Sequence, residues 1–271
     1  MESTRDLSHL LAEFNREGYV VARGLFDQEE ATWYRDHFMH LRETGTYPGD
    51  FAGINTDSDD PLVRYPRLIH MHRWDEASRD WMLDERIVSI LETLLGEPML
   101  GVQTMLYFKP PGARGQALHQ DQFYLQAKPG GCIAAWMALD EVDEANGCLR
   151  VVPKTQDLPI LCIEQADTTQ SFTGETVRIP EGTEAVPVRM QPGDVLFFGG
   201  QIVHGSYPND TADRFRRALI GHYVTERATK LPEFYHPALR ADGTEVAMEH
   251  TGKGGPCGVW HEIGQVEMVS R

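Results

Sequence analysis

The spacing of apolar residues predicts helices in the first part of the chain. Between residues 3 and 18, leucine and phenylalanine recur at intervals of three and four, which predicts an amphipathic helix. The run YVVARGLF (residues 19–26) then predicts a short buried strand. Asp27 and Glu30 form a capping-box pattern, so a second helix is expected to begin there and to continue to about Thr44.

Glycine, proline and aspartate are concentrated in residues 47–64, which predicts a long loop. Helical spacing returns in SRDWMLDERIVSILETLLG (residues 78–96) and predicts a third helix that ends at Gly96. We therefore expect residues 1–97 to form a mostly helical N-terminal part.

After Pro98 the pattern changes to short apolar runs separated by turn residues, which predict strands. These runs lie within residues 101–110, 117–125, 132–142, 148–153, 184–190, 194–206 and 216–225. We expect a mainly β protein with flanking helices, in which residues 98–226 form a jelly-roll core of two sheets. Residues 227–271 are expected to form an irregular C-terminal tail or lid, within a single domain of residues 1–271.

Composition narrows the range of partners. The 271 residues carry a formal net charge of -16, which disfavours nucleic acid, anionic membrane surfaces and the phosphates of an acyl-CoA. A compact polar or cationic metabolite suits this charge better. The chain shows neither a signal-peptide pattern nor a window as long as a transmembrane helix, so we expect a cytoplasmic protein. The oligomeric state is not specified by the sequence.

The cysteines of the chain are scattered and form no Cys-x-x-Cys metal motif. They are also too few for a disulfide scaffold in a chain of this length, so we interpret them as buried free thiols. They are Cys132, Cys148, Cys162 and Cys257.

Candidate chemistry begins with His119 and Asp121, two residues apart in an apolar and aromatic stretch. If this stretch is a strand, both side chains point to one face, where they can hold a metal or simply hydrogen-bond to each other. With 11 histidines and 41 acidic residues in the chain, such a triplet arises once or twice by chance. The pair therefore needs support from elsewhere in the sequence.

His204 and Arg216 supply that support on two later predicted strands. Two imidazoles and one carboxylate form the facial triad that suits non-haem Fe(II), because it leaves positions open for a 2-oxo acid and O2. A guanidinium suits the distal carboxylate of 2-oxoglutarate, and Ser206 could donate a second hydrogen bond. Strand alternation puts Arg216 and Arg217 on opposite faces, but both faces are largely apolar, so periodicity alone does not choose between them.

The order of several motifs resembles the phytanoyl-CoA dioxygenase family of Fe(II)- and 2-oxoglutarate-dependent oxygenases. Between residues 17 and 225 the similar stretches are REGYVVARGLF, TMLYFKPP, LHQD, AAWMALDEVDEANGCLRVVP, PGDVLFF, HGS and FRRALIGHYV. The resemblance implies a double-stranded β-helix, a cupin-like jelly roll, with iron held by His119, Asp121 and His204.

The same resemblance implies positions for the cosubstrate. It assigns 2-oxoglutarate to Arg216 and Ser206, with Met105 and Trp136 lining the pocket, and it puts His70 where the family often has a lysine. The sequence departs from the family at VVPKTQ (residues 151–156), which replaces a turn that usually resembles Pro-Gly-Ser-His, and in its C-terminal tail.

Substrate contacts are less defined by the pattern. Gln122 and Phe123 lie beside the metal pair, and His72 shares a predicted strand face with His70, so these three are candidate substrate residues. We interpret His222 as a core histidine.

The expected activity is hydroxylation of a small-molecule or natural-product-like substrate, with release of succinate and CO2. Iron(II), 2-oxoglutarate and O2 would be required, and ascorbate could act as reductant. The same iron chemistry can instead end in desaturation, cyclisation or oxidative deamination. A non-catalytic jelly roll that binds a small molecule is the alternative outside enzymes. The identity of the substrate and the position oxidised are not specified by the sequence.

Overall fold

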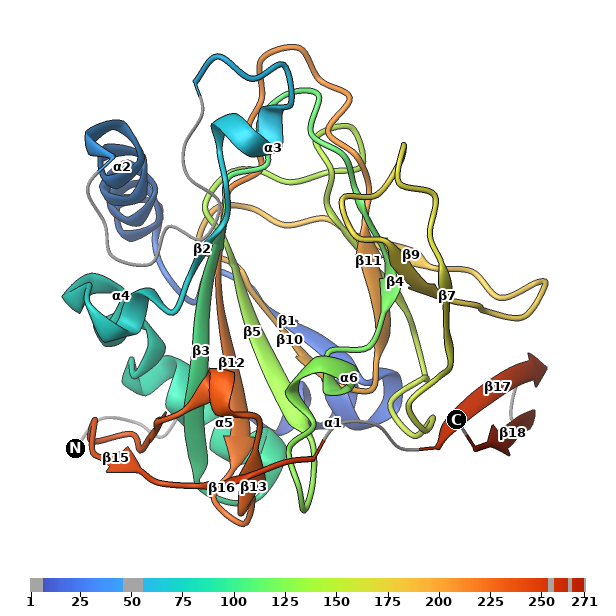
Figure 1. Cartoon of the computed structure of the whole chain (residues 1–271). Helices are drawn as coiled ribbons and strands as arrows, with labels where there is room; N and C mark the ends of the chain where they lie inside the picture. The colour runs from blue at the N-terminus through green and yellow to red at the C-terminus, as the bar shows by residue number, and fades with distance from the viewer. Residues whose placement is uncertain (1–6, 46–55, 253–255, 263–264, 271) are drawn as a thin grey trace.

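Two antiparallel sheets face each other in a computed structural model of the chain (Figure 1). The structure describes residues 7–45, 56–252, 256–262 and 265–270. The larger sheet has the order β1-β10-β5-β12-β3-β14-β15, and β2 also pairs with β3. Its strands are β1 (Tyr19–Ala22), β2 (Leu68–Ile69), β3 (Met99–Tyr107), β5 (Cys132–Ala138), β10 (Val195–Gly199), β12 (Ala218–Thr225), β14 (Ala238–Leu239) and β15 (Glu245–Val246).

The smaller sheet has the order β4-β11-β6-β9 and lies opposite the larger one. Its strands are β4 (Gln116–His119), β6 (Leu149–Val152), β9 (Val186–Val188) and β11 (Val203–Ser206). Three further pairs complete the β-structure: β7 (Ile163–Gln165) with β8 (Glu175–Val177), β13 (Lys230–Leu231) with β16 (Glu249–His250), and β17 (Cys257–Glu262) with β18 (Gln265–Val269). The predicted jelly roll is confirmed.

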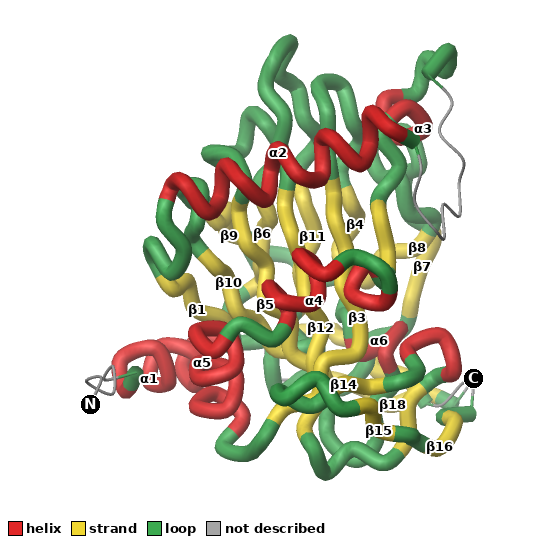
Figure 2. The backbone as a smooth tube through the Cα atoms, turned by 90° about the vertical axis from the view of Figure 1, so that its left-hand side faces the viewer, coloured by secondary structure: helices red, strands yellow, loops and turns green. Residues whose placement is uncertain are grey.

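Helices cover the outer face of the larger sheet, and Figure 2 shows α2, α4 and α5 in front of its strands. The helices are α1 (Ser8–Glu17), α2 (Gln28–Thr44), α3 (Pro61–Arg64), α4 (Glu76–Met82), α5 (Glu85–Leu95) and α6 (Gln122–Leu125), with 3-10 turns η1 (Met71–Arg73) and η2 (Glu233–Tyr235). Alternate residues of β5 divide between two cores. Ile133, Ala135 and Met137 pack under the helices, whereas Ala134 and Trp136 face the smaller sheet.

The first two predicted helices are present. Asp27 caps α2 through the backbone N–H groups of Glu29 and Glu30, and the Glu30 side chain accepts from the backbone of Asp27. The reciprocal capping box is therefore confirmed. The beginning of the first predicted helix, residues 3–6, lies outside the described residues. The first half of the predicted loop 47–64, residues 47–55, also lies outside the described residues, and the second half ends in the short helix α3.

The predicted third helix is two helices, not one. Leu83 ends α4, and Asp84 starts α5 by accepting a hydrogen bond from the backbone N–H of Arg86. Aspartate competes for backbone donors and so favours an N-cap over a helix interior. Gly96 closes α5 in the left-handed conformation, as predicted.

The predicted strand 194–206 is also divided. Its first half, β10, belongs to the larger sheet, and its second half, β11, belongs to the smaller one. The chain crosses between the sheets at Gly200, where a Cβ atom would collide with Cys132. A glycine is required here because the two chain segments approach so closely.

The segment expected to be an irregular tail or lid contains short strands among its described residues. These strands, β13 to β18, lie from Lys230 onward, and β14 extends the larger sheet by pairing with β3. Cys162 and Cys257 form a disulfide that joins the segment before β7 to β17, so these two are not free thiols as the sequence suggested. Cys132 and Cys148 are buried and free, as expected. Sequence spacing could not reveal the disulfide because its two cysteines are 95 residues apart.

None of the helices in the described ranges combines the length and the apolar character that a membrane crossing demands.

Candidate metal centre and adjoining cavity

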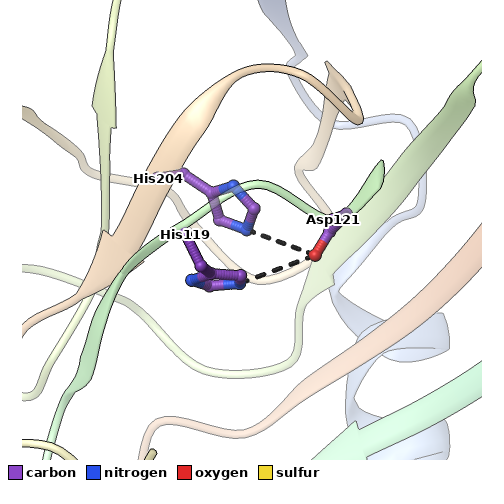
Figure 3. A group of neighbouring side chains, drawn as sticks. All are labelled: His119, Asp121 and His204. Carbon is purple, nitrogen blue, oxygen red and sulfur yellow. Dashed lines mark ion pairs between the residues drawn. The ribbon is translucent and has the colours of Figure 1, made fainter. Parts of the chain in front are cut away.

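Three side chains from two distant parts of the sequence converge on one another (Figure 3). The Oδ1 atom of Asp121 lies 3.5 Å from Nε2 of His119 and 3.8 Å from Nε2 of His204. All three residues are buried. Within the described part of the chain they form the one group of three potential metal ligands whose ligand atoms all lie within 4.8 Å of one another.

Asp121 reaches this position by a route different from the one expected. Strand β4 ends at His119, and Asp121 has helical backbone angles at the start of α6. The turn is held by the side chain of Gln120, which donates to Gln201 and accepts from the backbone N–H of Leu161. His119 and Asp121 therefore meet because the chain turns, and not because they alternate along one strand.

The hydrogen bonds of the two imidazoles point their Nε2 atoms to a common centre. Nδ1 of His119 lies 2.9 Å from the carbonyl oxygen of Ala117, and Nδ1 of His204 lies 3.1 Å from that of Ile202. A carbonyl can only accept, so each Nδ1 donates its proton and each Nε2 keeps a lone pair. The amide nitrogen of Gln116, 3.2 Å from Nε2 of His119, is consistent with that assignment.

His222 completes the surroundings of the carboxylate. Its Nε2 lies 3.2 Å from Oδ2 of Asp121, the oxygen that does not face His119 and His204. Burial acts to raise the pKa of Asp121, but His204 and His222 hold this pKa well below its usual range. Burial, followed by the proximity of His119, lowers the pKa of His204 to about 4. The group thus presents an ionised carboxylate and a neutral imidazole, the forms in which these side chains bind metals.

These donors fit a divalent transition metal. Adjacent ligand atoms around an ion with bonds of about 2.1 Å are roughly 3 Å apart, so only small movements would close the site. Two imidazoles and one carboxylate on one side of an ion form the triad typical of non-haem Fe(II).

A cavity of about 230 Å³ opens beside the triad, between the two sheets. Seven of the residues proposed from sequence line it: His119, Asp121, His204, Arg216, Ser206, Met105 and Trp136. Side chains of both sheets, of α6 and of the C-terminal segment contribute to its wall. The jelly roll thus brings together residues that are up to 168 positions apart in the sequence, from Arg67 to Tyr235.

Arg216 is buried at the cavity with part of its hydrogen-bonding capacity free. Its Nε donates to the carbonyl oxygen of Gly147 at 2.9 Å, and its guanidinium lies 5.3 Å from the ring centroid of Trp136. Nη1 is buried and has no hydrogen-bond partner among the described residues. Burial lowers the pKa of Arg216 to about 10. A buried guanidinium with a free donor suits a carboxylate ligand.

A buried lysine supports the same region, and the sequence analysis missed it. Nζ of Lys109 donates to Oγ of Ser206 at 2.9 Å, and that oxygen also accepts from the backbone N–H of Gln116. Lys109 fits because its neighbour Gly147 has no side chain, and a Cβ there would collide with the lysine. Burial, followed by the charge of Arg216, holds the pKa of Lys109 well below its usual range. Its location in the motif TMLYFKPP gave no indication of burial.

Arg217 points away from the cavity. It forms a two-point ion pair with Asp140, with N–O distances of 2.8 and 2.6 Å, and its guanidinium lies over the ring of Phe215. The structure thus distinguishes two neighbouring arginines that periodicity left equivalent.

Four other residues proposed from sequence do not line the cavity. Gln122 bonds to the backbone of Ala127 and Cys132, and Phe123 packs against Tyr124. These contacts keep both side chains out of the cavity wall, because α6 is a helical turn and not a strand.

His70 and His72 also lie outside the cavity, and they do not share a strand face. His70 follows β2 in the left-handed conformation and packs against Phe234, and His72 lies in η1 and bonds to Thr104. Burial lowers the pKa of His70 to about 3 and that of His72 to about 4, so both are neutral.

Several residues of the wall were not proposed from sequence as site residues. They are Arg67, Ile69, Gln103, Tyr107, Gln116, Tyr124, Leu125, Leu149, Phe172, Thr173, Phe198, Ile220, His222, Phe234 and Tyr235. Alternation along the predicted strand did place His222 on the face of Arg216, but it could not show that His222 reaches Asp121. Phe234 and Tyr235 show that the C-terminal segment forms part of the cavity.

Comparisons with known proteins agree with this geometry. Residues 14–218 match the family model described as Phytanoyl-CoA dioxygenase (PhyH). The chain is 30% identical over 229 residues to the peroxisomal phytanoyl-CoA dioxygenase of Homo sapiens; the match covers 78% of this chain and 66% of the human one. It is 24% identical over 233 residues to the methylphosphonate hydroxylase of Gimesia maris, with 85% and 86% of the two chains covered.

Among solved structures, the fold is similar to that of the epimerase SnoN in complex with Fe3+, alpha ketoglutarate and nogalamycin RO. The TM-score is 0.64 at 21% identity, and the match covers 84% of this chain and 86% of SnoN. This likeness shows a shared fold.

Proposed function

Since the chain belongs to the phytanoyl-CoA dioxygenase family, and is thereby a 2-oxoglutarate-dependent non-haem iron dioxygenase, we propose that it hydroxylates a small-molecule substrate. The products from the cosubstrate would be succinate and CO2. Relatives that the chain resembles act on an acyl-CoA in one case and on methylphosphonate in another, to judge from their names, so the family does not specify the substrate.

One observation carries the proposal. The lone pairs of His119 and His204 and the Oδ1 atom of Asp121 converge beside a cavity that is also lined by Arg216, whose buried Nη1 has no hydrogen-bond partner among the described residues. A metal triad next to a buried, partly unsatisfied guanidinium is the combination that a metal-bound 2-oxo dicarboxylic acid requires.

The residues have separate roles in this proposal. His119, Asp121 and His204 would hold Fe(II), and His222 would keep the Asp121 carboxylate oriented by donating to Oδ2. When bound, Fe(II) supplies the redox chemistry by which O2 oxidises both 2-oxoglutarate and the substrate.

The cosubstrate would be held at its far end. Arg216 would donate to the C5 carboxylate of 2-oxoglutarate, and Ser206 would add a second hydrogen bond while Lys109 holds its hydroxyl in place. Met105 and Trp136 would exclude water from this end of the cavity, which strengthens the ion pair.

The test is substrate-dependent turnover of 2-oxoglutarate. The protein is supplied with Fe(II), ascorbate, O2 and 2-oxoglutarate, and succinate is measured in the presence of candidate metabolites. The unmodified protein should form succinate, and His204→Gln should not. His250→Gln is the matched control, because His250 is exposed in the C-terminal segment and stacks on His236.

Product analysis separates hydroxylation from the other outcomes of the same chemistry. A hydroxylated product gains one oxygen atom, whereas desaturation and cyclisation remove two hydrogen atoms without adding oxygen. Metal-independent binding of 2-oxoglutarate, with no succinate formed under any condition, would favour a non-catalytic binding protein.

A further inference from the structure

Arg67 occupies a defined position at the cavity wall. It immediately precedes β2, whose Leu68 and Ile69 pair with Leu106 and Met105 of β3, and this register puts Arg67 beside Tyr107. Its Nη1 donates to the hydroxyl of Tyr107 at 3.3 Å, and its guanidinium lies 5.9 Å from the ring centroid of Phe172. All three side chains line the same cavity as the metal triad.

The charge of Arg67 is not balanced by the wall around it. No ion pair joins Arg67 to a carboxylate in the ranges that the structure describes. Asp121 is the one acidic side chain that the described wall of the cavity contains, and it belongs to the metal triad. The other polar groups of the described wall are hydroxyls, amides, imidazoles and the guanidinium of Arg216.

With metal and cosubstrate bound, the cavity would keep one unbalanced positive charge. A divalent metal, ionised Asp121, dianionic 2-oxoglutarate and protonated Arg216 together sum to zero. The positive charge of Arg67 then remains unbalanced, on an exposed side chain of the cavity wall that a substrate can reach.

We propose that Arg67 anchors a single anionic group, a carboxylate or a phosphonate, on a compact substrate. This inference rests on the proposed function and specifies the substrate class of the same site. It differs from the cationic metabolite that the net charge of -16 suggested, because that charge is spread over the surface, whereas recognition depends on the charge inside the cavity.

The rest of the wall fits the body of such a substrate. Tyr107 and Phe172 lie against Arg67, and Phe234 and Tyr235 add aromatic surface to the wall of the same cavity. Aromatic faces alone could bind a cation, but the adjacent guanidinium would repel it. The volume of about 230 Å³ is below the range of roughly 300–1,000 Å³ usual for drug-sized ligands, so the substrate should be compact.

Matched pairs of anionic and neutral probes test the inference directly. Calorimetry on anaerobic protein loaded with Fe(II) and 2-oxoglutarate measures the affinity for two sets of probes. The aromatic set is phenylacetate, benzylphosphonate and the neutral phenylacetamide, and the aliphatic set is hexanoate and the neutral hexanamide. The unmodified protein should bind at least one anion about ten- to a hundredfold more tightly than its amide, the range expected for a hydrogen bond to a charged group. The two acids distinguish a carboxylate from a phosphonate.

Variants assign the preference to Arg67. Arg67→Gln should remove it while leaving amide binding unchanged, and Arg67→Lys should retain part of it. Arg240→Gln is the control, because Arg240 forms an exposed ion pair with Glu226 and does not line the cavity.

The possible results are separable. If no anion binds more tightly than its amide, or if Arg67→Gln keeps the preference, the inference is wrong. It is equally wrong if Arg67→Gln weakens 2-oxoglutarate binding and leaves the probes unaffected, since Arg67 would then serve the cosubstrate. A failure of the proposed function is recognised differently: the unmodified protein would neither bind 2-oxoglutarate with Fe(II) nor form succinate.

Discussion

His222 lies on the opposite side of the Asp121 carboxylate from the other two histidines of the site. Its Nε2 is 3.2 Å from Oδ2, whereas His119 and His204 face Oδ1 at 3.5 and 3.8 Å. One oxygen of the carboxylate is therefore left to a metal, and the other is fixed by a hydrogen bond. Such partners orient metal ligands without contacting the ion.

Replacing His222 should consequently weaken metal binding. We expect His222→Phe to reduce the affinity for Fe(II) or Mn(II) about ten- to a hundredfold, because Asp121 loses the donor that orients it. His222→Gln, which can still donate to Oδ2, should retain most of the affinity. Competition with a chromophoric chelator measures both constants. Equal affinities for the two variants would mean that the hydrogen bond has no such role.

Asp121 fills the position that related halogenases leave vacant for chloride. Asp121→Ala should abolish metal-dependent oxidation, because two imidazoles alone hold a divalent ion weakly. The unmodified protein should form no chlorinated product in chloride buffer, as judged by mass spectrometry. Detection of a chlorinated product would contradict this prediction.

The adjacent arginines should respond differently to truncation. Arg216→Ala should cost on the order of 3 kcal/mol in binding of 2-oxoglutarate, roughly a hundredfold, because one half of a buried charge-assisted pair is lost. Arg217→Ala removes the ion pair with Asp140 outside the cavity and should lower the free energy of unfolding by only about 1 kcal/mol. Calorimetry with 2-oxoglutarate and denaturant unfolding of both variants test the distinction. Equal losses of cosubstrate affinity would leave Arg216 without a special role.

Lys109 should make stability depend on pH. Burial depresses its pKa, so the unfolded chain binds more protons than the folded protein between that lowered pKa and the ordinary value near 10.5. The free energy of unfolding should therefore rise with pH in this window, by at most about 1.4 kcal/mol per pH unit from this group.

Lys109→Met removes that contribution. Compared with the unmodified protein, the variant should be relatively more stable at pH 6.5 than at pH 9.5, as measured by denaturant unfolding without 2-oxoglutarate. Lys154→Met is the control, because Lys154 is not buried. A difference between variant and unmodified protein that stays constant with pH would show that Lys109 remains charged in the fold.

The substrate is expected not to be an acyl-CoA, although the family is named for one. Coenzyme A carries several phosphate charges, which would lie outside this small cavity and against the surface of a chain with a net charge of -16. The cavity of about 230 Å³ also offers little room for a long branched acyl chain beside the cosubstrate. Succinate release should be compared for phytanoyl-CoA and small acids or amines. Efficient hydroxylation of the thioester at low-micromolar concentration would refute the expectation.

Local signals in the sequence determined much of the fold. The capping box of Asp27 and Glu30 and the terminal glycine Gly96 could be read directly, because a helix end is stabilised by residues within one turn of it. The alternation of turns and apolar runs after Pro98 was sufficient to predict the jelly roll that the structure shows. His119, Asp121 and His204 were found because their order and spacing resemble those of a known family.

Tertiary structure decided what depends on the approach of distant segments. Periodicity could not separate Arg216 from Arg217, because both faces of a central strand covered by helices and a second sheet are apolar. The bond from His222 to Asp121 joins residues 101 positions apart, and the disulfide joins residues 95 apart. Lys109 and Arg67 look like ordinary surface cations in the sequence. In the folded protein Lys109 is buried and donates to Ser206, and Arg67 lines the cavity. The sequence could not show this, because burial and the balance of charge depend on which segments pack together.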